Sequence, residues 1–457
     1  MASRVLMVSY VYPPIGTMGG VRTQKFAKYL PDHGWVPTVL TVKRDRTFWA
    51  QGEPAEINGA ECKVIRAAFP DIIQAAKRTM ISMGIFPSWD PGEEEGLVES
   101  GDEPGYKRKI RRFLQGIRKG ARQWIVFPDD YSLWFPFALF KGGLELLSGD
   151  YRALYSTSPP VTNHVVAAAL QRLSGLPWVA DFRDPWTQND FLAEKLSPLR
   201  LSIERRFERF VLSRAGAIVA VTRPWADALR ELHGQRPHGV RCIMSGFDPD
   251  DYEEKMTPTT DRFILTYAGM LYGFKRDPTV VVEAVEQLID EGFVDPGDVG
   301  IRFYGPYEPK LTQLRNSLQH PEIVEIRGVI SRSESIRRQQ ESTALLILQW
   351  NDPYTKGVYG GKIFEYLGAG RPIIAFTYKH GILGELMKKL GVGYASMDAG
   401  EIKAVMRRWF EEFAATGGLE FAGIEDEIKR LRWDHLSGEL AAVLDDVSRA
   451  GRPLKGG

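Results

Sequence analysis

Short runs of Val, Ile and Leu alternate along this 457-residue chain with longer segments of helical periodicity. Apolar strands separated by helices are typical of parallel sheets that helices cover on both faces. The predicted strands are Val5–Ser9, Thr38–Val42, Lys63–Arg66, Ala153–Ser156, Trp178–Ala180, Ala217–Val221, Arg241–Met244, Ile264–Tyr267, Ile301–Tyr304, Val324–Arg327, Ala344–Leu348 and Ile373–Phe376. The predicted helices include Val21–Leu30, Val165–Leu173, Leu201–Leu212, Pro278–Leu288 and Lys362–Leu367. This alternation predicts an α/β fold.

The alternating pattern restarts near residue 262 and so divides the chain into two parts. Between them lies an acidic stretch, Asp248–Asp261, which contains two prolines and is the best candidate for a linker. Two domains also fit the chain length, because one domain holds roughly 100–200 residues. We therefore predict two doubly wound, Rossmann-like domains, residues 1–247 and 262–422, joined by the linker 248–261. Ligands bind at the carboxyl ends of the strands in such folds, and we expect them in a cleft between the domains.

The composition argues against several classes of protein. Lys and Arg number 59 against 58 Asp and Glu, and a net charge of +1 argues against a nucleic-acid-binding polycation. The two cysteines, Cys62 and Cys242, are far apart, which argues against a disulfide framework or a zinc site built from cysteines. The apolar run Val5–Val8 is too short for a signal peptide, and no apolar stretch reaches the ~20 residues that span a bilayer. We expect a cytoplasmic protein.

The segment Lys107–Trp124 carries eight basic residues and no acidic one. Its apolar residues recur at helical spacing and fall on one narrow face. One interpretation is a basic amphipathic helix that contacts an anionic membrane, which would make the protein peripheral on the inner face of the membrane. The alternative is a surface helix whose charge is neutralised by the preceding acidic loop, Trp89–Pro104.

Two glycine-containing turns join predicted strands to helices. In the first, Gly19 and Gly20 let backbone N–H groups and a helix N-terminus approach an anion or a sugar. Its spacing is not Gly-x-Gly-x-x-Gly, so a dinucleotide site is weakly indicated, and a plain turn is the alternative. The second turn, Gly269–Pro278, carries Lys275 and Arg276, which suit a diphosphate because each charge-assisted hydrogen bond contributes roughly 1.5–3 kcal/mol. A solvated Lys-Arg pair is the alternative there.

A second glycine pair, Gly360 and Gly361, stands before the predicted helix that begins at Lys362. Lys362 and Glu365 are three residues apart, so they share a helix face. A cation and a carboxylate at a helix start can address a phosphate and vicinal hydroxyls together. The alternative is a local Lys–Glu pair on a surface helix.

Taken in order, these motifs resemble those of a retaining glycosyltransferase of family 4, which has the GT-B fold of two Rossmann-like domains. The resemblance covers nearly the whole chain, and it rests on the order of the motifs rather than on any one of them. The matching elements are Tyr12-Pro13-Pro14 with Gly19-Gly20, Ser245–Asp248, Gly269–Lys275, Gly328 after the strand Val324–Arg327, Lys362–Pro372, and Trp433-Asp434. By this resemblance, residues 423–457 form helices that return to the first domain.

The resemblance implies a nucleotide-sugar site, a UDP-sugar in the first place, in the C-terminal domain. Glu365 would hold the ribose hydroxyls, Lys275 the diphosphate, and the backbone near Gly328 the base, while Gly19 and Gly20 would approach the donor from the other domain. The donor-binding candidates are Gly19, Gly20, Lys275, Arg276, Gly328, Gly360, Gly361, Lys362 and Glu365. The resemblance implies no cofactor besides this co-substrate and no bound metal.

The chain departs from the family pattern at three places. Gly357 stands where the family often has the first of two glutamates, and backbone groups at Val358–Gly361 are expected to replace that contact. Met270 stands where an Arg is usual, and Arg276 is expected to supply the charge instead. His164 lies slightly beyond the position of the family's N-terminal-domain histidine, and its position favours a structural helix residue.

Asp181, Arg183 and Asp184 follow a predicted strand directly. Three charges at the carboxyl end of a strand are costly unless they are paired or functional. Asp184 or Arg183 is expected to orient the acceptor, and an Asp181–Arg183 ion pair is the structural alternative. The catalytic candidates are therefore Asp184, Arg183 and His164.

The resemblance implies transfer of a sugar with retention to a hydroxyl of a glycan, a lipid-linked saccharide or a small metabolite. Fixed cations would stabilise the diphosphate as it leaves. Three alternatives remain. A nucleotide-sugar epimerase of similar architecture would need no acceptor, and a non-catalytic member would bind a glycan or a partner protein. A nicotinamide-dependent oxidoreductase is disfavoured because the Gly-x-Gly-x-x-Gly spacing is missing.

Overall fold

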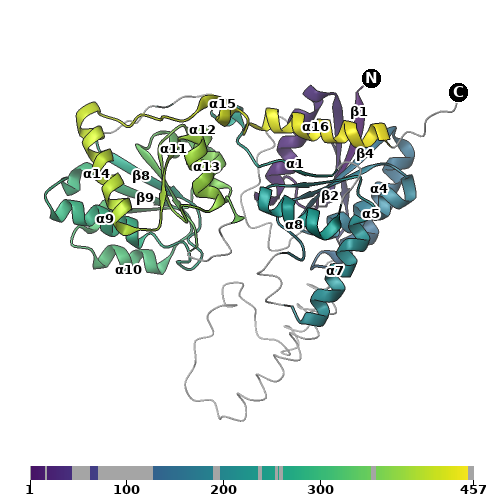
Figure 1. Ribbon diagram of the computed structural model, residues 1–457, viewed down its shortest axis with the longest axis horizontal. Coiled ribbons are helices and arrows are strands. Elements are labelled where there is room, and N and C mark those ends of the chain that lie inside the picture. Colours follow the sequence, from purple (N-terminus) through teal and green to yellow (C-terminus); the bar gives the residue numbers. More distant parts are fainter. Residues whose placement is uncertain are drawn as a thin grey trace, which may run out of the picture. The chain divides into compact units, whose positions relative to one another are not determined.

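The computed structural model describes residues 2–15, 18–43, 62–69, 127–188, 196–234, 239–252, 256, 261–350 and 357–450 (Figure 1). The chain divides into two compact units. The first comprises Met1–Val219, Leu229–Val240 and Val443–Gly457, and the second comprises Ala220–Ala228 and Arg241–Ala442. The basic segment Lys107–Trp124, with its predicted membrane contact, lies outside the described residues.

The first sheet has seven strands in the order β3-β2-β1-β4-β5-β6-β7. These strands are β1 (Ser3–Val8), β2 (Trp35–Val42), β3 (Lys63–Ala67), β4 (Tyr151–Ser158), β5 (Trp178–Phe182), β6 (Ala217–Ala220) and β7 (Val240–Cys242). The helices of this part of the chain are α1 (Met18–Tyr29), α4 (Phe135–Ser148), α5 (Thr162–Ser174), α7 (Pro198–Leu212) and α8 (Arg223–His233). The pairings of β1 with β2 and β4, of β2 with β3, and of β4 with β5 are all parallel.

The second sheet has six strands in the order β10-β9-β8-β11-β12-β13. Its strands are β8 (Phe263–Ala268), β9 (Val299–Tyr304), β10 (Val324–Gly328), β11 (Ala344–Leu348), β12 (Ile373–Phe376) and β13 (Gly393–Ser396), all in parallel pairings. The helices here are α9 (Thr279–Asp290), α10 (Pro309–Ser317), α11 (Arg332–Gln340), α12 (Lys362–Ala369), α13 (Ile382–Leu390), α14 (Ala399–Thr416) and α15 (Glu425–Lys429). The last helix, α16 (Trp433–Ala450), begins in the second unit and ends in the first.

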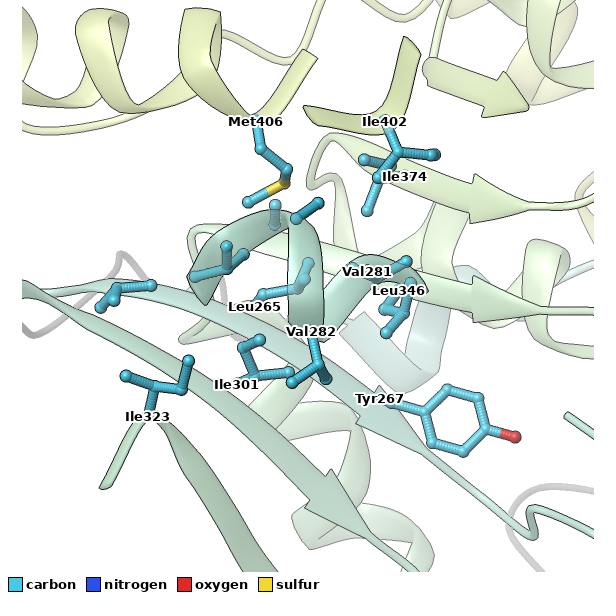
Figure 2. Close-up of a cluster of buried hydrophobic side chains, with 14 of the residues drawn as sticks. Leu265, Tyr267, Val281, Val282, Ile301, Ile323, Leu346, Ile374, Ile402 and Met406 are labelled. Atoms are coloured by element: carbon cyan, nitrogen blue, oxygen red, sulfur yellow. The ribbon is translucent and has the colours of Figure 1, made fainter. Parts of the chain in front are cut away.

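Both faces of the second sheet are buried, as the continuous apolar runs of its strands require. Figure 2 shows one face, where Leu265 of β8 and Ile301 of β9 pack under α9 and α14. Along β11, Leu346 belongs to this cluster, whereas Leu345 and Ile347 belong to a cluster on the opposite face. Successive side chains of a strand point to opposite faces, so one strand serves both clusters.

The predicted α/β class with two doubly wound sheets is confirmed. In each sheet the strand that comes first in the chain lies inside the sheet, with the second strand on one side and the fourth on the other. The chain therefore continues toward one edge of the sheet after the first strand and toward the opposite edge after the fourth. Ligands of doubly wound folds bind at this switch point, between these two strands. The sequence prediction missed β13, because Gly393–Ser396 lacks a run of branched apolar residues.

Candidate functional site

The loop that follows β8 lies at the switch point of the second sheet, because β8 pairs with both β9 and β11. The loop is tightly wound. The carbonyl of Leu271 accepts a hydrogen bond from the N–H of Arg276 at 3.1 Å, and the N–H of Gly269 donates to the carbonyl of Tyr304 at 2.7 Å. These bonds fix the two adjacent cations that the sequence singled out, Lys275 and Arg276, next to the end of β8.

Three consecutive residues of this loop have left-handed backbone angles. Tyr272 has a φ of 53°, Gly273 of 64° and Phe274 of 69°, and the two aromatic residues are the only non-glycine residues with positive φ in the described part of the chain. Such a conformation is rare for a bulky side chain and is concentrated at ligand sites. The rest of the fold therefore imposes this loop shape on residues that do not favour it.

Aromatic rings and cations gather around the loop. The ammonium of Lys275 lies 5.1 Å from the ring centre of Trp350, which follows β11, and the guanidinium of Arg276 lies 4.6 Å from that of Tyr272. The rings of Tyr272 and Trp350 meet edge to face at 5.9 Å. Trp350 was not predicted to belong to this cluster, because the sequence around a single Trp after a strand does not show which other loop it contacts.

Arg276 contacts Met270, the residue that stands where the family usually has an arginine. Its Nη1 donates to the carbonyl of Met270 at 3.4 Å and to the hydroxyl of Tyr267 at 3.5 Å. The Met270 side chain itself is half-exposed. The guanidinium thus lies beside the position where the family usually has an arginine.

Lys362 joins the same cluster from the start of α12. Its ammonium lies 5.1 Å from the ring centre of Tyr267, the residue that also contacts Arg276. Space for this ammonium comes from Gly269, where an added Cβ would lie 2.1 Å from Lys362 Nζ. Three cations therefore converge at the end of β8.

Replacing Gly269 with Ala is expected to weaken nucleotide binding at least tenfold. The φ of 142° at this position disfavours an L side chain, at a cost of about 1–3 kcal/mol, and the new Cβ would displace the Lys362 ammonium. Isothermal calorimetry with UDP measures the affinity. Gly297→Ala is the matched control, because no described atom lies within 4 Å of its Cβ position. Unchanged affinity in Gly269→Ala would show that Lys362 does not bind the nucleotide.

Burial lowers the pKa of Lys362 to about 8, with Arg276 adding to the decrease and Glu365 opposing it. The side chain is therefore charged below about pH 8 and neutral above it. We expect nucleotide affinity to fall as the pH rises through 8, because the neutral amine no longer attracts a diphosphate. Calorimetry from about pH 7.5 to about pH 8.8 tests this, because a phosphate whose second pKa is near 6 is already almost fully charged there. Lys362→Arg should abolish the dependence, because arginine stays charged.

Glycines that approach one another closely stand at the carboxyl ends of three strands: Gly269 follows β8, Gly305 follows β9, and Gly328 is the last residue of β10. The N–H of Gly305 donates to the carbonyl of Gly328 at 2.9 Å, and a Cβ on Gly305 would lie 2.3 Å from the carbonyl oxygen of Gly269. Gly328 has a φ of 74°, and Val329 beside it is 75% exposed. The backbone near Gly328 is thus open at the carboxyl edge, where the sequence placed the base.

The start of α12 offers backbone N–H groups. Gly361 is the residue that precedes the helix, and no side chain caps it. Gly360, with a φ of 74°, turns the chain into the helix, and the Val358 carbonyl before it accepts a hydrogen bond from Gln349 Nε2 at 2.7 Å. Uncapped N–H groups at a helix N-terminus favour an anionic ligand group.

Glu365 does not form the local pair with Lys362 that was the alternative interpretation. Its carboxylate lies 3.8 Å from Nη1 of Arg332 in α11, and Arg332 also pairs with Asp251 at 2.9 Å. The hydroxyl of Tyr252 donates to the backbone carbonyl of Glu365 at 2.8 Å. Arg332 is thus the charged partner of the carboxylate, while Tyr252 holds the helix backbone at Glu365. Neither Arg332 nor Tyr252 was singled out from the sequence.

The position of the missing carboxylate, Gly357, has room for a side chain. The nearest described atom to an added Cβ is Trp225 Nε1 at 3.8 Å, an ordinary van der Waals distance. Steric exclusion therefore does not explain the glycine.

In the first sheet the loops after β1 and β4 meet at the switch point, and Arg183 joins them. Its guanidinium donates to the backbone carbonyls of Gly19, at the start of α1, and of Pro159, after β4, while its Nε donates to the Ser158 carbonyl at 3.3 Å. Gly20 lies in the first turn of α1, where an added Cβ would meet the carbonyl of Val11 at 3.4 Å. Arg183 therefore connects the two loops in this structure.

Asp181 is paired with a residue that the sequence did not indicate. Arg22 of α1 donates to its two carboxylate oxygens at 2.8 and 2.9 Å, and the hydroxyls of Tyr155 and Thr157 donate to it as well. Asp181 is completely buried and Arg22 is 2% exposed. The structural alternative of an Asp181–Arg183 ion pair is thus replaced by a buried Arg22–Asp181 pair that joins α1 to β5.

The other two catalytic candidates differ in accessibility. Asp184 is exposed, although desolvation raises the pKa of its carboxyl and Arg183 opposes the increase. His164 is completely buried between Phe182 and Trp178, with its Nδ1 2.8 Å from the Ser156 hydroxyl. Burial lowers the pKa of His164 to about 3, so the ring is neutral. These contacts favour the structural interpretation of His164 over a catalytic one.

The described residues contain neither a metal-binding cluster nor a helix that could span a membrane. No group of three or more His, Cys, Asp and Glu side chains lies close enough together to hold a metal ion. No helix combines the length and apolar character needed to cross a bilayer.

Solved structures resemble this chain over almost its full length. Sucrose-phosphate synthase from Thermosynechococcus elongatus has a TM-score of 0.60 at 13% identity, covering 98% of this chain and 100% of that chain. A glycosyltransferase from Rickettsia africae has a TM-score of 0.58 at 14% identity, covering 98% of both chains. HepE from Anabaena, solved with UDP and glucose, has a TM-score of 0.57 at 14% identity, covering 97% of this chain and 99% of that chain. The fold is therefore that of the GT-B glycosyltransferases.

The sequence of the first unit places the chain more narrowly. Residues 19–244 match the model of the glycosyl transferase 4-like domain. This match, together with the GT-B fold, supports the family 4, or group 1, glycosyltransferase that the motifs predicted. No curated protein matches the sequence.

Proposed function

We propose that this glycosyltransferase uses a nucleotide-diphosphate sugar as its donor and binds it at the carboxyl edge of the second sheet. The observation that carries the proposal is the convergence of Lys275, Arg276 and Lys362 on one loop beside the uncapped start of α12. Fixed cations and helix N-terminal N–H groups stabilise a diphosphate both when it is bound and as negative charge develops on it.

The remaining donor contacts follow from the same edge of the sheet. Glu365 would accept hydrogen bonds from the ribose hydroxyls, and the open backbone at Gly328 would face the base. A UDP-sugar is the proposed donor, and the likeness to HepE, solved with UDP-glucose, supports it. Gly19 and Gly20 are the proposed donor contacts from the first unit.

For the transfer step, we propose attack by an acceptor hydroxyl on the face that the diphosphate leaves, which retains the anomeric configuration. Such a step needs no protein nucleophile, because the leaving diphosphate itself can receive the proton of the acceptor. Asp184, the exposed carboxylate at the end of β5, would orient the acceptor, and Arg183 would hold the neighbouring loops in place. The proposed acceptor is a glycan, a lipid-linked saccharide or a small metabolite.

A thermal-shift screen with UDP, GDP and ADP, followed by calorimetry, tests the donor class. We expect UDP to raise the unfolding temperature most. Incubation of the UDP-sugar with candidate acceptors then tests transfer, and NMR of the product shows its anomeric configuration. Conversion of the nucleotide sugar into an epimer in the absence of any acceptor would establish an epimerase. Nucleotide binding without turnover of any donor and acceptor pair would support a non-catalytic role, and inversion would exclude the same-face step.

A further inference from the structure

One face of α4 exposes large apolar side chains in a continuous stripe. Phe137 is 39% exposed, Phe140 64%, Leu144 49% and Leu147 87%. Their spacings of three, four and three residues place them along a single side of the helix. Soluble monomers rarely expose apolar side chains in such a contiguous row.

The neighbouring helices extend this surface. Figure 1 shows α4, α5 and α7 side by side, and α5 packs against both of the others. Leu173 of α5 is 70% exposed, and Leu199 and Phe210 of α7 are each 64% exposed. Leu199 and Phe210 are eleven residues apart, about three helical turns, so they lie on one side of α7. We call this surface the α4–α5–α7 face.

The exposed charges of the α4–α5–α7 face are all positive. The exposed basic residues of the three helices are Lys141, Arg172, Arg205, Arg206 and Arg209. Their acidic residues are Glu145, Glu204 and Glu208, which are 9%, 1% and 0% exposed. Glu145 pairs with Lys63, and Glu204 pairs with Arg200. Glu208 accepts a hydrogen bond from the Thr187 hydroxyl. No carboxylate of these helices therefore offsets the positive charge at the surface.

We propose that the α4–α5–α7 face binds the surface of an anionic lipid bilayer. Apolar side chains enter the boundary between headgroups and acyl chains, while arginine and lysine contact lipid phosphates. A second copy of this face is a poor partner, because it would bring five cations against five cations. This proposal goes beyond the donor chemistry and uses residues distinct from the basic segment Lys107–Trp124.

Flotation of the full-length protein with vesicles tests the proposal. We expect binding to vesicles of phosphatidylcholine with phosphatidylglycerol, weaker binding at high salt, and little binding to phosphatidylcholine alone. Phe140→Ser with Leu144→Ser, and separately Arg206→Glu with Arg209→Glu, should each reduce binding at least roughly tenfold, since each basic residue near the surface contributes about 1 kcal/mol. The circular dichroism spectrum and the unfolding temperature should be unchanged in both variants, which shows that they are folded.

Matched controls lie on the second unit. Ile424→Ser replaces a half-exposed apolar residue, and Arg408→Glu reverses an exposed charge, so neither should change vesicle binding. Wild-type vesicle binding in both variants of the α4–α5–α7 face would overturn the proposal. If vesicle binding is lost only when the basic residues of Lys107–Trp124 are changed, that segment is the membrane contact instead. If the protein forms dimers in the absence of lipid, and if these variants abolish the dimers, then the partner of this face is a second copy of the chain.

Discussion

Asp181→Ala is expected to lower the free energy of unfolding by about 3–5 kcal/mol, because it leaves the Arg22 guanidinium buried without its counter-charge. The hydroxyls of Tyr155 and Thr157 lose an acceptor in the same substitution. Urea denaturation followed by circular dichroism measures the effect. Asp181→Asn should be less damaging, since the amide oxygen still accepts a hydrogen bond.

Asp150→Ala is the matched control for this prediction. Asp150 lies in the same unit, its side chain is 82% exposed, and its ion pair with Arg152 is 3.6 Å long. Exposed pairs of this kind contribute about 0–1 kcal/mol. If Asp181→Ala costs no more than Asp150→Ala, the Arg22–Asp181 pair does not stabilise the first unit.

Lys275→Ala and Glu365→Ala are expected to weaken UDP binding by roughly 10- to 150-fold each. A charge-assisted hydrogen bond contributes about 1.5–3 kcal/mol, and tenfold in affinity corresponds to about 1.4 kcal/mol. Lys275 would lose a diphosphate contact and Glu365 a ribose contact. Calorimetry gives the dissociation constants, and circular dichroism should remain that of the wild type.

Lys403→Ala serves as the control for charge removal in the second unit. Lys403 lies on α14 and pairs at 2.7 Å with Glu291, the residue that follows α9, and it makes none of the contacts described for the candidate site. Its removal should leave UDP affinity unchanged. Wild-type affinity in both Lys275→Ala and Glu365→Ala would mean that the donor binds elsewhere.

The strands could be predicted from the sequence because most are runs of branched apolar residues buried on both faces, such as Ala344–Leu348. Their alternation with helices then predicted the doubly wound fold. β13 escaped prediction because its residues, Gly-Tyr-Ala-Ser, carry little strand propensity. Tertiary pairing with β12 makes it a strand.

The candidate site was only partly predictable. Lys275, Arg276 and Lys362 were found because cations beside glycines at strand ends suit phosphate. The partners of the charged groups were not found, because they are distant in sequence. Arg22 and Asp181 are 159 residues apart, and an arginine in a helix gives no sign of burial. Ion pairs of this kind depend on the packed fold rather than on any local pattern.

The left-handed residues Tyr272 and Phe274 have a consequence for ligand affinity. Their unfavourable backbone conformation is established when the protein folds, before any ligand arrives. A diphosphate bound there as proposed would therefore meet cations whose positions are already set, and little chain entropy would be lost on association. The proposed donor loop is thus preorganised, and its selectivity would depend on a rigid shape rather than on a loop that adapts to each ligand.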